Sequence, residues 1–170
     1  MRFLKRVFRW CLWIAATCLV LLALGWWLAR PATPDAFYEA AADTGVAPGT
    51  LLRSEPFTRA VPPGARAWRI LYATTRGDGS PAVASGVVMT AAATDAKPRP
   101  VIAWAHGTTG LARGCAPSLF PDPFLNVPAV RQLLAENWVY VATDYVGLGA
   151  PGSHAYLVGE EAARAVLDSV

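Results

Sequence analysis

An apolar run that ends abruptly at a His-Gly pair constrains the fold of this chain more than any other feature. Residues 101–105 (VIAWA) are rich in β-forming side chains, and the chain then becomes small and polar at residues 106–110 (HGTTG). A buried parallel strand has this apolar pattern, and the two glycines let the backbone turn sharply where the strand ends. A second apolar run, residues 138–142 (WVYVA), leads into a loop with two glycines at residues 143–149. Because α/β sheets bind ligands at the carboxyl ends of their strands, we expect both loops to face one cleft.

Strand and helix patterns around these two runs predict an α/β fold. Residues 66–75 and 82–90 predict an antiparallel hairpin across the turn RGDGS at residues 76–80. Apolar spacing predicts a helix at residues 128–136, and paired acidic residues mark the start of another at residues 159–170. This order predicts a hairpin followed by parallel strands with right-handed crossover helices. Two shorter features complete the prediction: a brief helix at residues 35–42 and irregular chain at residues 46–54.

The charge distribution separates the first 30 residues from the rest. The whole chain has 15 Lys and Arg against 12 Asp and Glu, a formal net charge of +3. Five of the cations lie in the first 30 residues, so the remaining chain has ten cations against twelve acids. That part is therefore mildly acidic, and we expect no binding to nucleic acid.

The first 30 residues have the pattern of a membrane anchor. A stretch of 18 uncharged residues, from Cys11 to Leu28, follows four cations and ends beside Trp26, Trp27 and Arg30. A span needs about 20 apolar residues, and positive charge before it holds the N-terminus in the cytoplasm. A cleaved signal peptide shares the basic start and the apolar middle. We favour the anchor because bulky side chains occupy the expected cleavage positions. With either segment, the chain from residue 31 onward is expected outside the cytoplasm, membrane-anchored or, after cleavage, secreted or periplasmic.

The sequence divides into three parts. Residues 1–30 are the anchor or signal segment, residues 31–65 a linker and N-terminal extension, and residues 66–170 part of one α/β domain. Two of the three cysteines lie in the apolar segment and are expected only to pack. Cys115 is left over in an oxidising compartment, which indicates a free thiol or a disulfide partner outside this chain.

Several motifs in order give the chain a resemblance to a known family. They are WAHGTTG at residues 104–110, GCAPS at residues 114–118 and TDYVGLG at residues 143–149, with YLVGE at residues 156–160 before a helix. Together they resemble the amino-terminal portion of the secretory lipases, α/β-hydrolases that include the fungal lipases A and their bacterial relatives. The resemblance covers about residues 50–170. It implies hydrolysis of carboxylic esters or lipids by a Ser, Asp and His triad, with no cofactor.

The chemistry of that family gives the HGTTG loop a role. Attack on an ester carbonyl creates an oxyanion, and each backbone N–H donor aimed at it contributes about 3–4 kcal/mol. In these folds one donor comes from the loop after the third strand, in a His-Gly motif. The resemblance implies that Thr108 is this donor, with Thr109 second and Gly107 in the same oxyanion loop. The alternative is an ordinary strand-ending turn, and the downstream motifs favour the oxyanion loop.

Other residues of the two loops are expected to line the same cleft. His106 is expected to orient its loop through hydrogen bonds, because the catalytic His of the family comes late in the chain. Asp144 is expected to hold the following glycine loop by accepting backbone N–H bonds. A metal site of His106, Asp144 and His154 is not expected, since no pair has ligand spacing on one element. The cleft-lining set is His106, Gly110, Asp144, Tyr145, Gly147 and His154.

The sequence lacks the nucleophile motif of the fold. That motif is Gly-x-Ser-x-Gly on a strand-to-helix turn, and none of the six serines has glycine at both flanking positions. The resemblance therefore implies that nucleophile, acid and base lie beyond Val170, that the domain is truncated before the nucleophile, and that this polypeptide alone is inactive. Two alternatives stay open: a non-enzymatic or vestigial extracytoplasmic binding domain, and a peptidase of the same fold. A Gly-x-Ser-x-Gly encoded soon after Val170 would favour the hydrolase over the binding domain.

Overall fold

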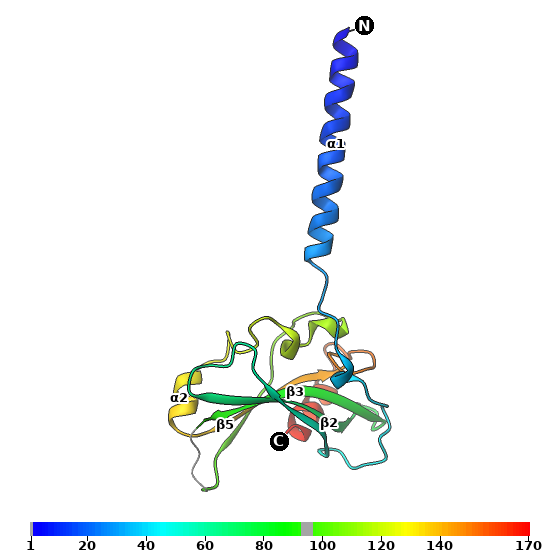
Figure 1. Cartoon of the computed structure of the whole chain (residues 1–170). Coiled ribbons are helices and arrows are strands. Elements are labelled where there is room, and N and C mark those ends of the chain that lie inside the picture. Colours follow the sequence, from blue (N-terminus) through cyan, green and yellow to red (C-terminus); the bar gives the residue numbers. More distant parts are fainter. Residues whose placement is uncertain (1, 93–96) are drawn as a thin grey trace. The chain divides into compact units, whose positions relative to one another are not determined.

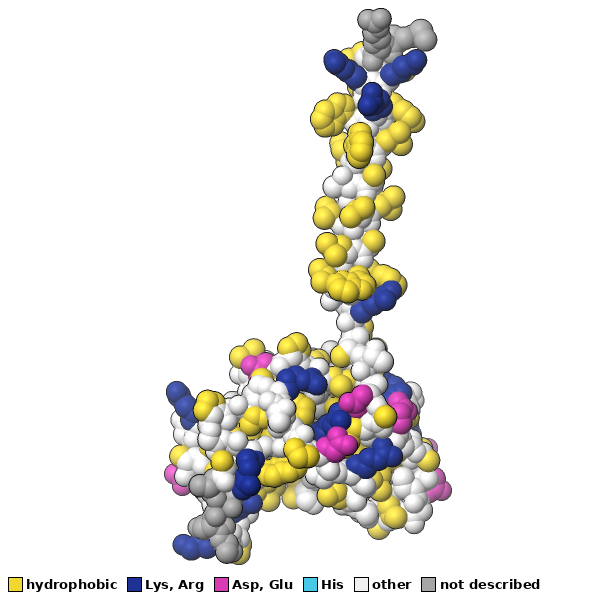
Figure 2. Space-filling model, viewed as in Figure 1, with side chains coloured by type: hydrophobic (Ala, Val, Ile, Leu, Met, Phe, Trp, Pro, Cys, Tyr) yellow, Lys and Arg dark blue, Asp and Glu magenta, His cyan; other side chains and the backbone are white. Residues whose placement is uncertain are grey.

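The structure, a computed structural model, describes residues 2–92 and 97–170 (Figure 1). The chain forms two compact units that divide between Pro31 and Ala32. The first unit is the helix α1 (Arg2–Leu28), whose 27 residues give a length of about 40 Å, more than the roughly 30 Å of a bilayer core. Figure 2 shows Lys and Arg side chains near its N-terminal end and hydrophobic side chains along the rest. Within the described residues, α1 is the one helix that could cross a membrane, and a signal sequence near the N-terminus has the same properties.

The second unit is built on one mixed sheet of five strands in the order β1-β2-β3-β5-β4. The first four strands of this order pair antiparallel, and β4 pairs parallel with β5 at the edge. The sheet confirms the predicted α/β class, with the hairpin β2–β3 and a parallel pair joined through a helix. The bounds are β1 (Leu51–Phe57), β2 (Ala65–Thr75), β3 (Pro81–Ala91), β4 (Val101–Trp104), β5 (Val139–Val146), α2 (Val130–Ala135) and α3 (Gly159–Asp168).

The N-terminal extension differs from its prediction. Residues 46–54 were expected to be irregular, yet residues 51–54 begin the strand β1, which pairs along the outer edge of β2. Most of β1 is exposed, so its sequence shows no apolar alternation, and its Pro56 is tolerated because edge strands need not donate every amide. The helix expected at residues 35–42 is a single 3₁₀ turn, Ala36–Tyr38, capped by the Asp35 carboxylate at the amide of Phe37.

Strand β5 extends further than its apolar run. The sequence predicted a loop from residue 143, but residues 143–146 continue the strand and pair with β3. The β3–β5 register shifts at Ser85/Gly86, where a Cβ on Gly86 would overlap the carbonyl oxygen of Ala142. Because of this register shift, the polar residues at the end of β5 remain paired with β3.

Helices pack against both faces of the sheet. Tyr140 and Ala142 of β5 pack in the cluster that contacts α2, while Val141 points to the opposite face, as the two-residue period of a strand requires. On the α3 side, the Tyr72 hydroxyl donates to the Ala165 carbonyl at 2.7 Å and accepts from Thr143 Oγ1 at 2.6 Å. Helix α3 is therefore hydrogen-bonded directly to the sheet.

Candidate functional site

The HGTTG loop begins where β4 ends, and its first two carbonyls are already hydrogen-bonded. The Tyr145 hydroxyl donates to the His106 carbonyl at 3.0 Å, and His106 Nδ1 donates to the Gly107 carbonyl at 2.6 Å. The peptide bonds here are trans, so each N–H points opposite to the carbonyl of its own peptide unit. The amides of Gly107 and Thr108 are consequently directed away from these partners. This arrangement leaves the two amides free of competition from the loop's own acceptors.

Tyr145 holds this loop from β5 in an unusual backbone conformation. Its φ is +68°, which side-chain-bearing residues rarely adopt and which costs roughly 1–3 kcal/mol. The amide of Tyr145 donates to Thr143 Oγ1 at 2.9 Å, and its ring lies against the His106 ring with centroids 4.4 Å apart. Burial raises the pKa of the Tyr145 hydroxyl, which therefore remains a hydrogen-bond donor. Backbone strain is therefore present at the residue that orients the HGTTG loop.

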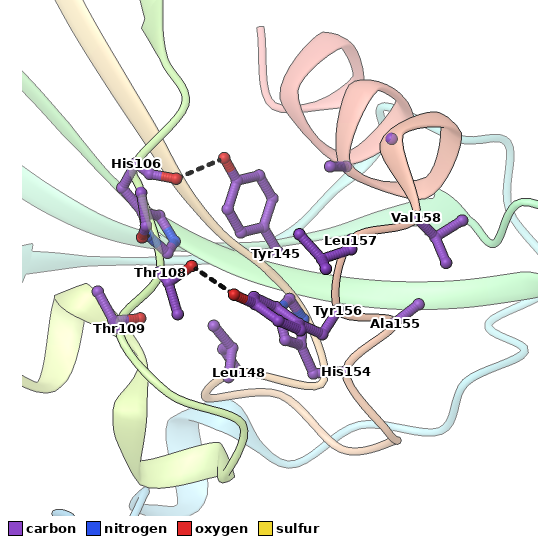
Figure 3. Close-up of a pocket in the computed structure, with 13 residues that line it drawn as sticks. His106, Thr108, Thr109, Tyr145, Leu148, His154, Ala155, Tyr156, Leu157 and Val158 are labelled. Atoms are coloured by element: carbon purple, nitrogen blue, oxygen red, sulfur yellow. Dashed lines mark hydrogen bonds between the residues drawn. The ribbon is translucent and has the colours of Figure 1, made fainter.

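Four rings, one from β5 and three from the loops after β4 and β5, line a cavity of about 350 Å³, called here the ring pocket (Figure 3). The rings belong to His106, Tyr145, His154 and Tyr156, and successive centroids lie 4.4, 6.2 and 6.3 Å apart. The Thr108 and Tyr156 hydroxyls lie 3.1 Å apart at the mouth. Gly107, Thr108 and Thr109 border the same space. The loops after β4 and β5 thus meet at one cavity.

Two glycines keep the walls of the ring pocket in place without lining it. Gly110 has φ +133°, and a Cβ there would overlap the Sγ of Cys115. Gly147 has φ +79°, and a Cβ there would overlap the backbone of Ser153 and His154. This close approach allows His154 Nδ1 to donate to the Val146 carbonyl at 3.0 Å. Both positions therefore require glycine for conformation and for space.

Asp144 is the centre of a buried hydrogen-bond network behind the loop. Its carboxylate accepts from the Ser118 amide at 2.8 Å, from Ser118 Oγ at 2.5 Å and from Ser85 Oγ at 2.6 Å. The Tyr38 hydroxyl lies 2.9 Å from Ser118 Oγ and donates to it, since the serine proton is committed to Asp144. Burial raises the pKa of Asp144, and the serine hydrogen bonds oppose that increase. The donors to Asp144 are thus Ser118 and Ser85, in place of the glycine-loop amides that the sequence suggested.

The sequence-predicted residues fall into two groups. His106, Gly107, Thr108, Thr109, Tyr145 and His154 line the ring pocket. Gly110, Gly147 and Asp144 support it from outside, and Asp144 also borders a second cavity. Sequence reasoning missed Tyr156, Ser118, Ser85 and Tyr38. The first two belong to the YLVGE and GCAPS motifs, which carried the family resemblance without an assigned role.

Among the described residues, neither the cysteines nor the acidic side chains form a further recognisable centre. Cys115 makes no disulfide with any described residue, and its thiol packs against Gly110. Among residues 2–92 and 97–170, no three His, Cys, Asp or Glu side chains gather in a metal-ligand arrangement.

Comparison with solved structures gives consistent neighbours. The rice cell wall degrading esterase LipA from Xanthomonas oryzae is 30% identical, with a TM-score of 0.57 over 73% of this chain and 36% of that one. Candida antarctica lipase A in its closed state is 24% identical, with a TM-score of 0.61 over 79% of this chain and 34% of the lipase. A second structure of that lipase gives 22% identity and a TM-score of 0.62. Neither protein-family models nor curated protein sequences give a match.

These neighbours define the class of the fold. The sheet order, the loop after β4 and the matched structures show a lipase-like α/β-hydrolase fold, of which the chain forms the amino-terminal portion. The chain spans about a third of the length of the esterase and the lipase that it matches.

Proposed function

We propose that the chain contributes the oxyanion side of a carboxylic ester hydrolase site. The Thr108 amide is the principal donor, with Thr109 and Gly107 beside it. One observation carries the proposal: the His106 and Gly107 carbonyls are bound by Tyr145 Oη and His106 Nδ1, so the peptide units that carry the Gly107 and Thr108 amides are held in fixed orientations beside the ring pocket. Preoriented donors stabilise an oxyanion without reorganisation during the reaction.

In this proposal the nucleophile, acid and base come from residues outside these 170. The environments of the buried serines support this assignment. Ser85 and Ser118 are 1% and 0% exposed, and each donates to the Asp144 carboxylate. A serine hydroxyl acts as a nucleophile when a base takes its proton at an accessible position, and neither residue has such an arrangement.

A pair of substitutions at one position tests the oxyanion role. The polypeptide encoded by the gene with the codons after Val170 is assayed with a chromogenic acyl ester, beside the 170-residue chain. We expect Thr108→Pro, which removes the amide proton, to lower kcat about 10²–10³-fold, while Thr108→Ser retains the amide and most of the activity.

Three results would contradict the proposal. They are equal activity of Thr108→Pro and Thr108→Ser, robust turnover by the 170-residue chain alone, and the absence of any downstream Gly-x-Ser-x-Gly. The last would favour a binding domain of the same fold.

We also propose that α1 anchors the protein with the folded unit outside the cytoplasm. The basic end and apolar length of the helix support this orientation. Protease added to intact spheroplasts should then degrade the folded unit, and a protected unit would contradict the proposed orientation.

A further inference from the structure

The Thr108 and Tyr156 hydroxyls are paired at the mouth of the ring pocket (Figure 3), and neither oxygen has another hydrogen-bond partner among the described residues. Thr108 is exposed and Tyr156 is 44% exposed, so the pair is open to solvent and to a ligand in the ring pocket. A hydrogen bond between two hydroxyls uses one of their two protons. The second proton is left for an acceptor that the described residues do not supply.

The chemistry of the two groups decides which proton is left over. A phenolic hydroxyl is a stronger donor and a weaker acceptor than an aliphatic hydroxyl. Tyr156 therefore donates to Thr108 Oγ1, and the Thr108 hydroxyl keeps its own proton for another acceptor. Hydrogen bonds in a chain polarise one another, so the bond from Tyr156 makes the Thr108 hydroxyl a better donor.

The remaining proton of Thr108 lies next to the amide that the proposed function uses. The backbone nitrogen and Oγ1 of one threonine are separated by three bonds, so both donors are close enough to bind a single ligand oxygen. His106 Nδ1 donates to the Gly107 carbonyl, which fixes the peptide unit that carries the Thr108 amide. Tyr156 supplies the corresponding hydrogen bond for the Thr108 side chain.

A strained turn and a neighbouring ring fix the Tyr156 side chain. The Val158 amide donates to the Ala155 carbonyl at 3.2 Å, which makes Tyr156 and Leu157 the central residues of a β-turn. Leu157 has φ +64°, at a position where turns with positive φ usually carry glycine. The Tyr156 ring lies beside the His154 ring, with centroids 6.3 Å apart. Strained backbone clusters at functional sites, and here it adjoins a side chain that lines the ring pocket.

We propose that Tyr156 is a positioning residue, whose hydroxyl donates to Thr108 Oγ1 and makes the Thr108 hydroxyl a second donor to the ester oxyanion. Thr108 then binds the oxyanion through its amide and its side chain together. This inference rests on the proposed function and adds a residue to it. Because Tyr156 acts only through the Thr108 hydroxyl, its effect on the reaction disappears when that hydroxyl is removed.

A double-mutant cycle separates this positioning role from a general structural role. The polypeptide that continues past Val170 is assayed with a chromogenic acyl ester. We expect Tyr156→Phe to lower kcat about three- to tenfold with KM unchanged, the effect of one neutral hydrogen bond made in the transition state. Thr108→Val, which keeps the amide and removes the hydroxyl, should lower kcat about 10²-fold.

The two substitutions should not add. Tyr156→Phe should cost nothing further in the Thr108→Val background, whereas in the Thr108→Ser background, which keeps a hydroxyl, it should again lower kcat. A structural role would lower kcat by the same factor in both backgrounds. Thr58→Val is the matched control, because it removes an exposed hydroxyl outside the ring pocket lining and should leave kcat unchanged.

The contact itself is measured in the 170-residue chain in micelles. The chain has five Tyr, and tyrosine labelled with ¹³C at Cζ gives one NMR signal for each. Tyr156→Phe assigns the Tyr156 signal by its loss. We expect Thr108→Val, but not Thr108→Ser, to shift that signal, because the Cζ shift responds to the hydrogen bond of the hydroxyl. The other four signals report whether each variant is folded.

Failure of this inference differs from failure of the proposed function. An unmoved Tyr156 signal in Thr108→Val, an unchanged kcat in Tyr156→Phe, or additive losses in the double variant would overturn the positioning role and leave the amide role of Thr108 intact. Equal activity of Thr108→Pro and Thr108→Ser, or a longer polypeptide without ester hydrolysis, would overturn the proposed function and this inference with it.

Discussion

The buried Ser118–Asp144 pair gives the sharpest prediction for stability. Ser118 is fully buried, and its Oγ both donates to Asp144 and accepts from the Tyr38 hydroxyl. Ser118→Ala removes one hydrogen bond to a charged group, worth about 1.5–3 kcal/mol, and leaves the buried Tyr38 hydroxyl unpaired at a cost of about 1–3 kcal/mol. We therefore expect a loss of about 3–5 kcal/mol in the free energy of unfolding, a large share of the roughly 5–15 kcal/mol of a typical domain.

The free energy of unfolding that Ser118→Ala removes should increase with pH. Burial raises the folded pKa of Asp144 above its ordinary value of 3.8, so its contribution to stability falls as pH rises from there through the folded pKa. The Ser118 hydrogen bonds oppose that increase, and removing the hydroxyl raises the folded pKa further. The difference in stability between the variant and the natural chain should therefore grow as pH rises above 3.8, and it should be smallest at low pH, where Asp144 is protonated in both.

Urea unfolding of the full chain in micelles, followed by near-UV circular dichroism at several pH values, measures both effects. Ser80→Ala is the matched control, because it removes a Ser–Asp hydrogen bond of 2.7 Å to Asp78 on an exposed turn and should change little. The reasoning is refuted if Ser118→Ala costs no more than Ser80→Ala, or if its cost does not vary with pH.

Three further predictions concern the HGTTG loop and α1. Gly110→Ala should destabilise the second unit because its Cβ overlaps Cys115 Sγ, and adding Cys115→Ala should restore part of the loss; no restoration in the double-mutant cycle would contradict the contact. Tyr145→Phe should lower the free energy of unfolding by about 0.5–1.5 kcal/mol in urea, because the His106 carbonyl loses its donor, and unchanged stability would show that the hydroxyl does not hold the loop. When residues 1–170 are expressed, an uncleaved anchor predicts an intact mass of 18.1 kDa in the membrane fraction, and a smaller mass with a new N-terminus would indicate cleavage.

The sequence predicts those strands and helices whose buried residues form a visible apolar pattern. Strands β2 and β3 were expected within two residues of their observed ends, because their apolar and β-branched residues are continuous. Strand β1 was missed because it is an exposed edge with Pro56 inside it. The end of β5 was missed because residues 143–146 are held by pairing with β3, and no local sequence pattern reports that pairing.

The supporting contacts of the site were harder to predict than the loops themselves. The glycines and the His-Gly pair identified both loops, because their conformational demands are local. The partners of Asp144 lie 26 and 59 residues away, at Ser118 and Ser85, and a serine in isolation has many equivalent roles. The orientation that Tyr145 gives the loop depends on its positive φ, which the identity of the residue does not predict.

The Asp144 network also sets an order of events for a growing chain. The Ser118 turn obtains its partners from Tyr38, made 80 residues earlier, and from Asp144, made 26 residues later. Until β5 has been synthesised and paired with β3, the Tyr38 hydroxyl is the one member of this network that can hold the Ser118 turn. We expect the Ser118 turn to become resistant to a protease only after Asp144 has left the ribosome and β5 has paired with β3.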